Sequence, residues 1–558
     1  MSMSMFCFQC QEADRGKGCT VAGVCGKTAE TAALQDALMH MARGVAIYAT
    51  ALADAPSAEV CVPTDCYAWL RVALFKTITN ANFDDAAIEY SVWRGVAWRL
   101  ALQQDIARAE LKVPLASEHA AGWNPTSRDE LLNAQSKTGV LRSIDPDGRS
   151  LRELLTYGLK GLAAYLHHAA ELGSEDADLN AFLAKGLVAT INPDLDANSL
   201  TALVLEAGEK GVAAMALLDG ANTASYGHPE KTEVRIDVGE RPGILVTGHD
   251  LADLEALLEQ SKDSGIDIYT HCEMLPAHSY PGFKKYPHLY GNYGNAWWQQ
   301  HKEFTSFNGP ILFTTNCIVP PPHKATYTKR VFTTGAAGFP GYQHINPAAD
   351  GRKDFSQIIT MAKRCQPPEG IENGRITTGF AHHQVIQMAQ PILEAMKSGA
   401  VKRFIVMAGC DGRHTQRSYY TNYAKGLDAS DLILTAGCAK YRYNKLNLGS
   451  TLTPTGVEIP RVLDAGQCND SYSIALTALA LKEALGLDDI NELPIEYNIA
   501  WYEQKAVIVL LALLHLGVKS IRLGPTLPAF LSPGVAQLLV DQFGLHGIPD
   551  PATAEYSH

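Results

Sequence analysis

Beyond about Glu233, short apolar runs alternate with segments of helical periodicity, and this alternation restricts the possible folds more than any other feature of the sequence. It is typical of βαβ units, in which successive strands lie parallel in one sheet and helices cover its faces. The apolar runs are Ile244–Thr247, Ile266–Thr270, Ile311–Thr315, Phe404–Ala408, Leu432–Ala436 and Val462–Ala465. The sequence therefore predicts parallel α/β sheets in the second half of the chain.

The region before Glu233 follows a different pattern. Between about Thr28 and Ala224, apolar residues recur at intervals of three and four, which is the spacing of one helix face. Two residue pairs have the capping-box spacing that predicts a helix start. These pairs are Ser127 with Glu130 and Ser150 with Glu153. The second of these helices is expected to end near Gly173, because glycine readily adopts the left-handed conformation that closes a helix.

A chain of 558 residues is too long for one hydrophobic core, and a prior of about 150 residues per domain suggests three or four domains. A stretch containing Pro and Gly, Gln366 to Gly374, is the candidate linker within the α/β region. We therefore expect an α + α/β multidomain protein. Its parts are a helical domain over residues 1–233 and two α/β domains over 234–370 and 371–558.

Charge and hydropathy exclude two kinds of partner. The formal net charge is −12, and no basic run is interleaved with aromatic residues, so nucleic acid is not an expected partner. The longest uninterrupted apolar stretch, Ala506 to Leu514, is far shorter than the ~20 residues that span a membrane. The N-terminus has no basic segment followed by an apolar one. We expect a soluble, cytoplasmic protein without a membrane partner, whose cysteines are reduced.

Four cysteines lie within the first 25 residues, at Cys7, Cys10, Cys19 and Cys25. The first two can present thiolates from one tight turn, and the other two can complete the coordination of a compact centre. Four thiolates so close together fit an iron-sulfur cluster or a structural zinc ion, and spacing alone does not choose between them. Unligated thiols are the third alternative.

A second set of potential metal ligands follows the predicted strands. In open α/β sheets, ligands bind at the carboxyl ends of the strands. The residues at these ends are His249, Glu273, Cys317, Cys410, Cys438 and Cys468. A single cysteine at a strand end is usually a small buried residue, but six such endings favour one shared metal site. The glycines before several of these residues are expected to let the backbone approach a bulky centre.

Glu503 adds a carboxylate to this set. Ile499, Glu503 and Val507 have helical spacing, which predicts that Glu503 lies on the apolar face of a helix. A buried charge needs an ionic partner or a metal, although a frayed first turn would leave the carboxylate in water. Lys505 points to another part of that helix and is expected to be a solvated side chain.

The remaining candidate motifs in the sequence are weaker signals of function. Gly335-x-x-Gly338-x-x-Gly341 lacks the strand–turn–helix context of a dinucleotide-binding fingerprint and is interpreted as a loop. The His382-His383 pair is interpreted as surface or packing residues. The cysteines without a joint pattern are expected to be free thiols: Cys61, Cys66, Cys272 and Cys365.

Several longer motifs resemble one known family. They are Phe-Cys-Phe-Gln-Cys-Gln-Glu, Thr-Gly-His-Asp, His-Cys-Glu-Met-Leu-Pro-Ala-His, Gly-Cys-Asp-Gly, Tyr-Arg-Tyr-Asn-Lys-Leu, Asp-Ala-Gly-Gln-Cys-Asn-Asp and Trp-Tyr-Glu-Gln-Lys-Ala. The chain resembles the hybrid-cluster proteins, also called prismane proteins or hydroxylamine reductases, from Cys7 nearly to the C-terminus. Distant kinship with nickel-iron carbon monoxide dehydrogenases follows from this resemblance. The Met-Ser-Met-Ser extension before Met5 departs from the family pattern and bears on no ligand.

The resemblance implies two iron-sulfur centres. Cys7, Cys10, Cys19 and Cys25 would hold a 4Fe-4S cluster, because their tight spacing is similar to the branch of the family with a four-iron cubane. A hybrid 4Fe-2O-2S cluster would be held by His249, Glu273, Cys317, Cys410, Cys438, Cys468 and Glu503. Cys410 matches the position that carries a persulfide in oxidised members. Glu273, Cys410 and Glu503 are the expected catalytic residues.

The resemblance also implies a fold and an activity. The family has a helical N-terminal domain followed by two Rossmann-like α/β domains, with the hybrid cluster at their junction. The implied reaction is the reduction of hydroxylamine to ammonia and water, with reduction of nitric oxide to nitrous oxide as a second activity. No flavin or nicotinamide motif is visible in the sequence, so a separate reductase or ferredoxin-like protein is the expected electron donor.

Two other interpretations are kept open. The protein could act as a nitric oxide sensor or as a regulator of protein S-nitrosylation, in which case the cluster would react once rather than turn over. A carbon monoxide dehydrogenase-like activity is less favoured, because those relatives have additional cluster-ligating cysteines near the N-terminus and this chain has only four there.

Overall fold

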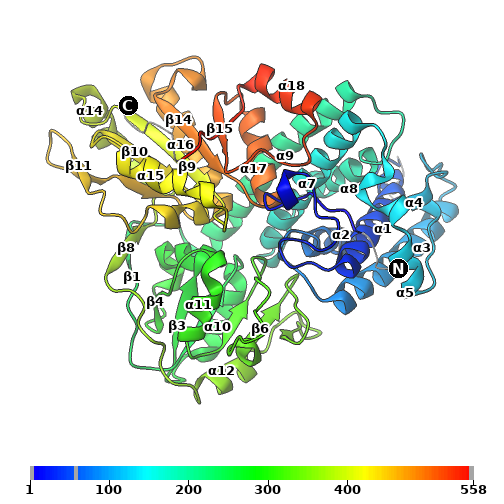
Figure 1. Ribbon diagram of the computed structural model, residues 1–558, viewed down its shortest axis with the longest axis horizontal. Coiled ribbons are helices and arrows are strands. Elements are labelled where there is room, and N and C mark those ends of the chain that lie inside the picture. Colours follow the sequence, from blue (N-terminus) through cyan, green and yellow to red (C-terminus); the bar gives the residue numbers. More distant parts are fainter. Residues whose placement is uncertain (1–4, 56–60, 552–558) are drawn as a thin grey trace.

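The computed structural model describes residues 5–55 and 61–551, so the Met-Ser-Met-Ser extension lies outside the described residues. A helical part, coloured blue to cyan in Figure 1, lies beside two sheets that are coloured green and yellow to red. Each of these sheets has six strands, all of them parallel. This arrangement confirms the predicted fold class of a helical N-terminal part followed by α/β parts.

The first 226 residues form helices wherever the described chain has regular structure. The long helices are α1 (Ala29–Ala53), α2 (Thr64–Lys76), α3 (Asp85–Arg108), α7 (Pro146–Glu171), α8 (Ala177–Ala189) and α9 (Ala197–Tyr226). Short helices α4 (His119–Gly122), α5 (Arg128–Asn133) and α6 (Gln135–Thr138) connect α3 to α7. The main apolar core runs from α1, α7 and α9 into the second sheet, so the helical part and that sheet share one buried interior.

The predicted helix starts had different outcomes. Ser127 is the N-cap of α5 and accepts a hydrogen bond from the Glu130 backbone N–H, as the capping-box spacing indicated. The start predicted at Ser150 is wrong, because α7 begins four residues earlier with Asp145 as its N-cap and Pro146 in its first turn. Proline is favoured there because its missing N–H would have no partner in the helix. Gly173 follows the end of α7 with a φ of +76°, as predicted.

The first sheet has the strand order β4-β3-β2-β5-β6-β7. Its strands are β2 (Gly243–Thr247), β3 (Asp267–His271), β4 (Leu289–Asn292), β5 (Ile311–Phe313), β6 (Val331–Thr334) and β7 (Gln343–Ile345). Helices α10 (Leu251–Ser261), α11 (Gln300–Ser306) and α12 (Ser356–Ala362) accompany it. Successive side chains of β2 belong to two separate apolar clusters, with Ile244 and Val246 on one face and Leu245 on the other. Both faces of the sheet are therefore buried, as expected for parallel strands.

The second sheet has the order β13-β10-β9-β14-β15-β16. Its strands are β9 (Arg403–Gly409), β10 (Asp431–Thr435), β13 (Val462–Asp464), β14 (Ile495–Ala500), β15 (Ile521–Gly524) and β16 (His546–Gly547). The helices of this part are α13 (His382–Gln387), α14 (Ala389–Ser398), α15 (Ser418–Gly426), α16 (Ser471–Leu485), α17 (Gln504–His515) and α18 (Pro533–Phe543). All six predicted apolar runs are strands of one sheet or the other. The other strands of the two sheets were not predicted: β4, β6, β7, β14, β15 and β16. Strand β14 was missed because Glu496 and Asn498 interrupt its apolar residues.

Two short antiparallel ribbons complete the fold. Strand β1 (Thr232–Arg235) pairs with β8 (Arg375–Thr378), and β11 (Ser450–Leu452) pairs with β12 (Glu458–Pro460). The predicted linker, Gln366 to Gly374, contains neither helix nor strand and leads directly into β8. We propose that the β1–β8 ribbon marks the passage between the three parts of the chain, close to the boundaries expected at residues 233 and 370.

A buried histidine beside the first sheet predicts a pH dependence of stability. His278 lies in the 3-10 helix Cys272–Ser279 with Nε2 3.0 Å from Thr270 Oγ1, and burial lowers its pKa from 6.5 to about 4. Between pH 4 and 6.5 the unfolded chain binds a proton that the folded chain does not. Unfolding therefore becomes easier as the pH falls through this window, by up to about 3 kcal/mol.

The measurement compares apparent Tm at pH 7 and pH 5 for the wild type and His278→Gln. The wild type is expected to lose more apparent Tm on acidification than the variant, since glutamine does not titrate. Equal losses in both proteins would show that His278 does not contribute to the acid sensitivity.

Candidate metal centre

The carboxyl ends of the two sheets lie against each other. His249 lies two residues after β2, and Glu273 lies in the 3-10 helix that follows β3. Cys468 lies beyond β13 in the other sheet, yet its backbone N–H donates to Glu273 Oε2 at 2.9 Å. The side chain of Gln467 also donates to the backbone oxygens of His249 and Glu273, at 3.0 and 2.9 Å. Strand ends separated by about 200 residues in sequence thus form one site.

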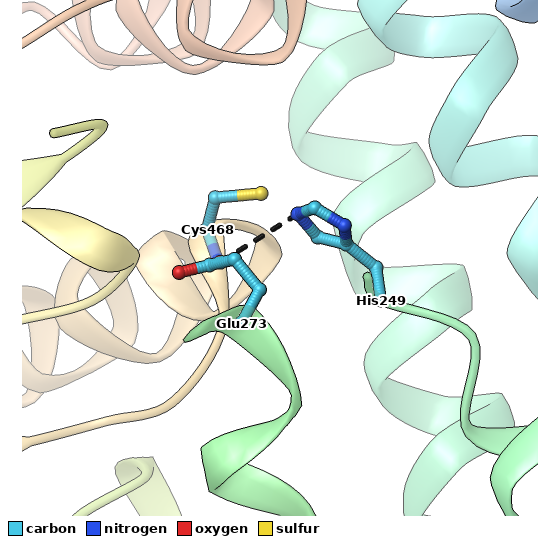
Figure 2. Close-up of side chains that lie close together, drawn as sticks. All are labelled: His249, Glu273 and Cys468. Atoms are coloured by element: carbon cyan, nitrogen blue, oxygen red, sulfur yellow. Dashed lines mark hydrogen bonds and ion pairs between the residues drawn. The ribbon is translucent and has the colours of Figure 1, made fainter. Parts of the chain in front are cut away.

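Three of the predicted ligands are already close enough to share a metal ion. His249, Glu273 and Cys468 are buried, and each offers one ligand atom within 4.8 Å of the others. His249 Nε2 is 3.7 Å from Glu273 Oε2. Figure 2 shows the three side chains converging from separate segments, with this ion pair as a dashed line. An imidazole, a carboxylate and a thiol form a mixed donor set that suits a first-row transition metal.

The ring of His249 is held in a defined orientation. Its Nδ1 lies 2.8 Å from the hydroxyl of Thr315, which follows β5. Burial, and after it the nearby ammonium of Lys505, lowers the pKa of His249 well below the ordinary value, so the ring is neutral. With Nδ1 bonded to the hydroxyl, Nε2 is the nitrogen that would bind a metal; it lies 3.7 Å from Glu273 Oε2 and 3.0 Å from the ammonium of Lys505.

Glu273 has one carboxylate oxygen that lacks a partner. Its Oε2 accepts the Cys468 N–H, but its Oε1 is buried and has no hydrogen bond. Burial raises the pKa of Glu273 to about 7, against the opposing effect of the ammonium groups of Lys440 and Lys505. An unpaired buried carboxylate oxygen is costly, and a bound cation would remove that cost. The side chain therefore fits the metal-ligand role expected for it.

The remaining predicted cysteines are also buried at the same junction. Cys410 and Cys438 directly follow the ends of β9 and β10, and Cys317 lies four residues beyond β5. Burial raises the pKa of the Cys410 thiol well above its ordinary value, and the nearby charges of Glu503, Cys438 and Cys468 raise it further. The Asp411 N–H donates to Cys438 Sγ at 3.2 Å. These raised pKa values keep the thiols protonated in the absence of a cation, whereas a bound metal would favour their thiolate forms.

Glu503 is buried as predicted, but for a different reason. Ile499 belongs to strand β14, so the helical spacing from Ile499 through Glu503 to Val507 has no structural basis. Glu503 is instead the N-cap of α17, and its Oε2 accepts the Lys505 N–H at 2.8 Å. Its side chain is 4% exposed, so the alternative of a frayed, hydrated carboxylate is wrong.

Lys505 was expected to be solvated, and this prediction is wrong. Its side chain is 1% exposed, with Nζ 3.0 Å from His249 Nε2 and 2.8 Å from Asn316 Oδ1. The same ammonium lies 3.7 Å from Glu503 Oε1. Helix α17 begins only at Gln504, so Lys505 lies in its first turn, which faces the junction of the two sheets. The sequence prediction extended this helix back to Ile499, and on that longer helix the side chain of Lys505 would point into solvent.

Two of the glycines before the predicted ligands, Gly409 and Gly437, are required by the packing of the backbone itself. A Cβ on Gly409 would lie 2.0 Å from the backbone oxygen of Ala500, and one on Gly437 would lie 2.4 Å from that of Gly409. Both glycines have positive φ, of +106° and +84°. They are needed because neighbouring backbone segments approach closely and the backbone turns sharply, and the closer approach of the backbone to a metal centre stays a prediction.

The four N-terminal cysteines also lie together. Cys7 and Cys19 pair through two backbone hydrogen bonds, at 3.0 and 2.8 Å. Burial, followed by the charges of Cys25 and Cys7, raises the pKa of Cys10 well above the ordinary value. The loop that holds these thiols packs against the second sheet, since the Gln11 N–H donates to the Tyr502 oxygen at 3.0 Å.

A buried arginine connects the two groups of predicted ligands. Arg417 has no solvent exposure and donates from Nη2 to Gln11 Oε1 at 3.0 Å and from Nη1 to the Cys410 oxygen at 2.9 Å. Gln11 directly follows Cys10 in the sequence. A short run of covalent and hydrogen bonds therefore joins the N-terminal thiols to the centre between the sheets.

Most of the weaker sequence matches lie apart from both groups of predicted ligands, and Cys272 is the exception. The stretch from Gly335 to Gly341 is a loop between β6 and β7, as predicted. His383 is exposed, with its ring 4.2 Å from that of His228, and His382 Nδ1 lies 3.0 Å from the Ser473 hydroxyl. Among the cysteines without a joint pattern, Cys61 is exposed, Cys365 is half-buried, and Cys66 and Cys272 are buried. The Cys272 thiol, immediately before Glu273, shares a hydrogen bond with the thiol of Cys438, so it lies beside the predicted ligands. In the described part of the chain, no helix is long and apolar enough to span a membrane.

The fold and the site together define a class of protein, in which a helical part joins two parallel sheets whose carboxyl ends enclose a candidate metal centre. The model of the Prismane/CO dehydrogenase family matches residues 5–554. The chain belongs to this family, which confirms the resemblance drawn from its motifs.

Named relatives are similar over nearly the whole chain. A protein named hydroxylamine reductase from Clostridium botulinum (strain 657 / Type Ba4) is 55% identical, with 97% of each chain covered. Another of that name from Thermoanaerobacter pseudethanolicus is 57% identical, with 98% of each covered. Among solved structures, carbon monoxide dehydrogenase IV from Carboxydothermus hydrogenoformans matches with a TM-score of 0.55 and 16% identity, covering 98% of this chain and 90% of that one. This structural likeness shows a shared fold.

Proposed function

We propose that this protein is an oxidoreductase that reduces hydroxylamine to ammonia and water at a hybrid 4Fe-2O-2S cluster. The reaction consumes two electrons and two protons for each N–O bond broken. The observation that carries the proposal is the meeting of His249, Glu273 and Cys468 at one buried point, with Glu273 Oε1 left without a partner. The relatives named hydroxylamine reductase, similar over 97–98% of the chain, support the same substrate.

The proposed cluster ligands are His249, Glu273, Cys317, Cys410, Cys438, Cys468 and Glu503. Thiolates bind iron firmly, whereas carboxylate and imidazole are harder ligands, so a cluster held by this set would supply electrons together with an iron position open to nitrogen or oxygen. The chain positions Glu273 for a change of ligation, because only its Oε2 is fixed by a backbone N–H. Glu273, Cys410 and Glu503 are the proposed catalytic residues.

The position of Lys505 adds it to the residues that we propose act in the reaction. Its ammonium hydrogen-bonds to Asn316 and lies beside both His249 and Glu503. A buried ammonium at this position can donate a hydrogen bond to the oxygen that leaves as water, and the burial of the site strengthens that interaction. The two carboxylates, Glu273 and Glu503, are the other groups in the proposed set that can hold a proton.

Electrons are proposed to arrive through a 4Fe-4S cluster on Cys7, Cys10, Cys19 and Cys25. Val21 and Val24 in the loop that holds these cysteines are exposed, so a separate reductase or ferredoxin-like protein could approach the loop. From there the Gln11–Arg417–Cys410 connection leads to the centre between the sheets. Hydroxylamine, and nitric oxide as a second small substrate, are the proposed reactants.

The first test is to measure iron, zinc and acid-labile sulfide per chain after purification without oxygen. About eight irons with fewer sulfides than irons are expected for one cubane and one oxygen-containing cluster. Stoichiometric zinc with little iron in repeated preparations would contradict the proposal and indicate a structural N-terminal site. Turnover with excess electron donor then separates an enzyme from a nitric oxide sensor, because a sensor would react only once per cluster.

A further inference from the structure

A buried lysine lies directly against the N-terminal thiols. Lys27 follows Cys25 by two residues, and its side chain turns back so that Nζ lies 3.3 Å from Cys7 Sγ. The same ammonium donates to Gln35 Oε1 on α1 at 2.9 Å. Lys27 is only 6% exposed, although lysine is among the residues most rarely buried. A buried ammonium must have compensating interactions, and the Cys7 thiol supplies one of them together with Gln35 and the nearby Asp36.

The surroundings of Lys27 have more positive than negative charge. A polar cavity of about 30 Å³ lies behind Cys7. The charged residues that line it are Lys27, Arg43, Arg142 and Lys160 on the positive side and Asp36 and Glu153 on the negative side. Lys160 Nζ also donates to Gln9 Oε1 at 2.9 Å, and Gln9 lies between Cys7 and Cys10. Burial lowers the pKa of Lys160 to about 7, so the cations that stay fully charged at neutral pH are Lys27, Arg43 and Arg142. Their excess of one positive charge over the two carboxylates is matched to an additional negative group at the cysteines.

Two physical effects then act on any redox centre held by Cys7. An N–H···S hydrogen bond withdraws electron density from the sulfur, and a buried cation stabilises the state with the extra electron. Both effects favour the reduced form.

We propose that Lys27 is a positioning residue that raises the reduction potential of the N-terminal iron-sulfur cluster through its hydrogen bond to Cys7 and its buried charge. This inference rests on the proposed function, which places a cluster on Cys7. Its consequence is that the cluster accepts electrons from a weaker donor than an otherwise identical cluster without the ammonium.

The test is a redox titration of the N-terminal cluster, followed by electron paramagnetic resonance, in wild type, Lys27→Met and Lys17→Met. Lys27→Met is expected to lower the one-electron reduction equilibrium constant at least tenfold, which corresponds to about 59 mV. Lys17 is the matched control, because it carries the same charge in the same loop but is exposed. Its loss should change the equilibrium constant by less than about threefold, since solvent screens it.

Two further variants guard against loss of the cluster in Lys27→Met. Lys27→Gln removes the charge at similar length and should also lower the potential, whereas Lys27→Arg keeps the charge and should stay near wild type. An unchanged potential in an iron-loaded Lys27→Gln or Lys27→Met would overturn the inference, as would an equal shift in Lys17→Met. Absence of an N-terminal cluster signal in the wild type would instead overturn the proposed function, so the two failures are distinguishable.

Discussion

Replacing Glu273 with alanine is expected to lower kcat for hydroxylamine reduction by about 100-fold or more. The variant should also change the spectrum of the centre between the sheets while leaving that of the N-terminal cluster intact. Removing the side chain deletes a proposed ligand and the oxygen that accepts the Cys468 N–H, so Cys468 loses its orientation as well. Steady-state turnover, iron content and electron paramagnetic resonance of the same samples measure the two effects together.

Glu303 supplies a matched control for the loss of a buried carboxylate. It is 1% exposed and pairs with His271 at 2.9 Å, but it is not among the proposed ligands. Glu303→Gln should keep both clusters even if stability falls. Full turnover and an unchanged spectrum in Glu273→Ala would show that Glu273 is not a ligand, and loss of both clusters would indicate misfolding instead of a ligand effect.

Replacing Gly409 with alanine is expected to be the most damaging change of a single small residue. Gly409 has a φ of +106°, and a Cβ there would lie 2.0 Å from the Ala500 oxygen of the adjacent strand. Strain and overpacking together should cost about 2–5 kcal/mol, because neither backbone can withdraw without breaking the β9–β14 pairing. Cys410 follows immediately and would be displaced, so iron at the centre between the sheets should be lost.

Gly399→Ala isolates the contribution of the backbone conformation. Gly399 has a φ of +78°, but no atom lies within 4 Å of the position of an added Cβ. Apparent Tm and iron per chain should fall only slightly in Gly399→Ala, whereas Gly409→Ala should lower apparent Tm by about 5 °C or more. If the two variants lost equal stability and Gly409→Ala kept its full iron content, the result would show that the close packing of β9 against β14 does not position Cys410.

Much of the fold could be predicted from residues that are neighbours in sequence. Apolar runs such as Ile244–Thr247 became buried parallel strands, because the two covered faces of such a sheet favour apolar side chains. The residues after these runs, including His249 and Cys410, then had to lie at the carboxyl edges of the sheets. Strand β14 was missed for the same reason, since Glu496 and Asn498 give it a mixed pattern.

The proposed ligands could be named from sequence, but their surroundings could not. Sequence periodicity predicted that Glu503 lies on the apolar face of a helix. In the structure Glu503 is the N-cap of α17 and accepts a hydrogen bond from the Lys505 N–H. The close approach of Gly409 to Ala500 is likewise a contact between two strands about 90 residues apart in the chain. A local pattern carries no information about which other strand will lie beside it.

Local sequence patterns were enough to predict a helical part followed by parallel α/β parts, the candidate ligands at the strand ends and the resemblance to the family. Only the tertiary structure decided that Lys505 is buried against His249, 256 residues away, and that Lys27 turns back onto Cys7. The physical reason is that periodicity reports which face of an element is apolar, whereas the partner of a buried charge depends on how distant elements pack. The sequence pattern around a lysine is the same whether its ammonium group lies in water or beside a cysteine sulfur.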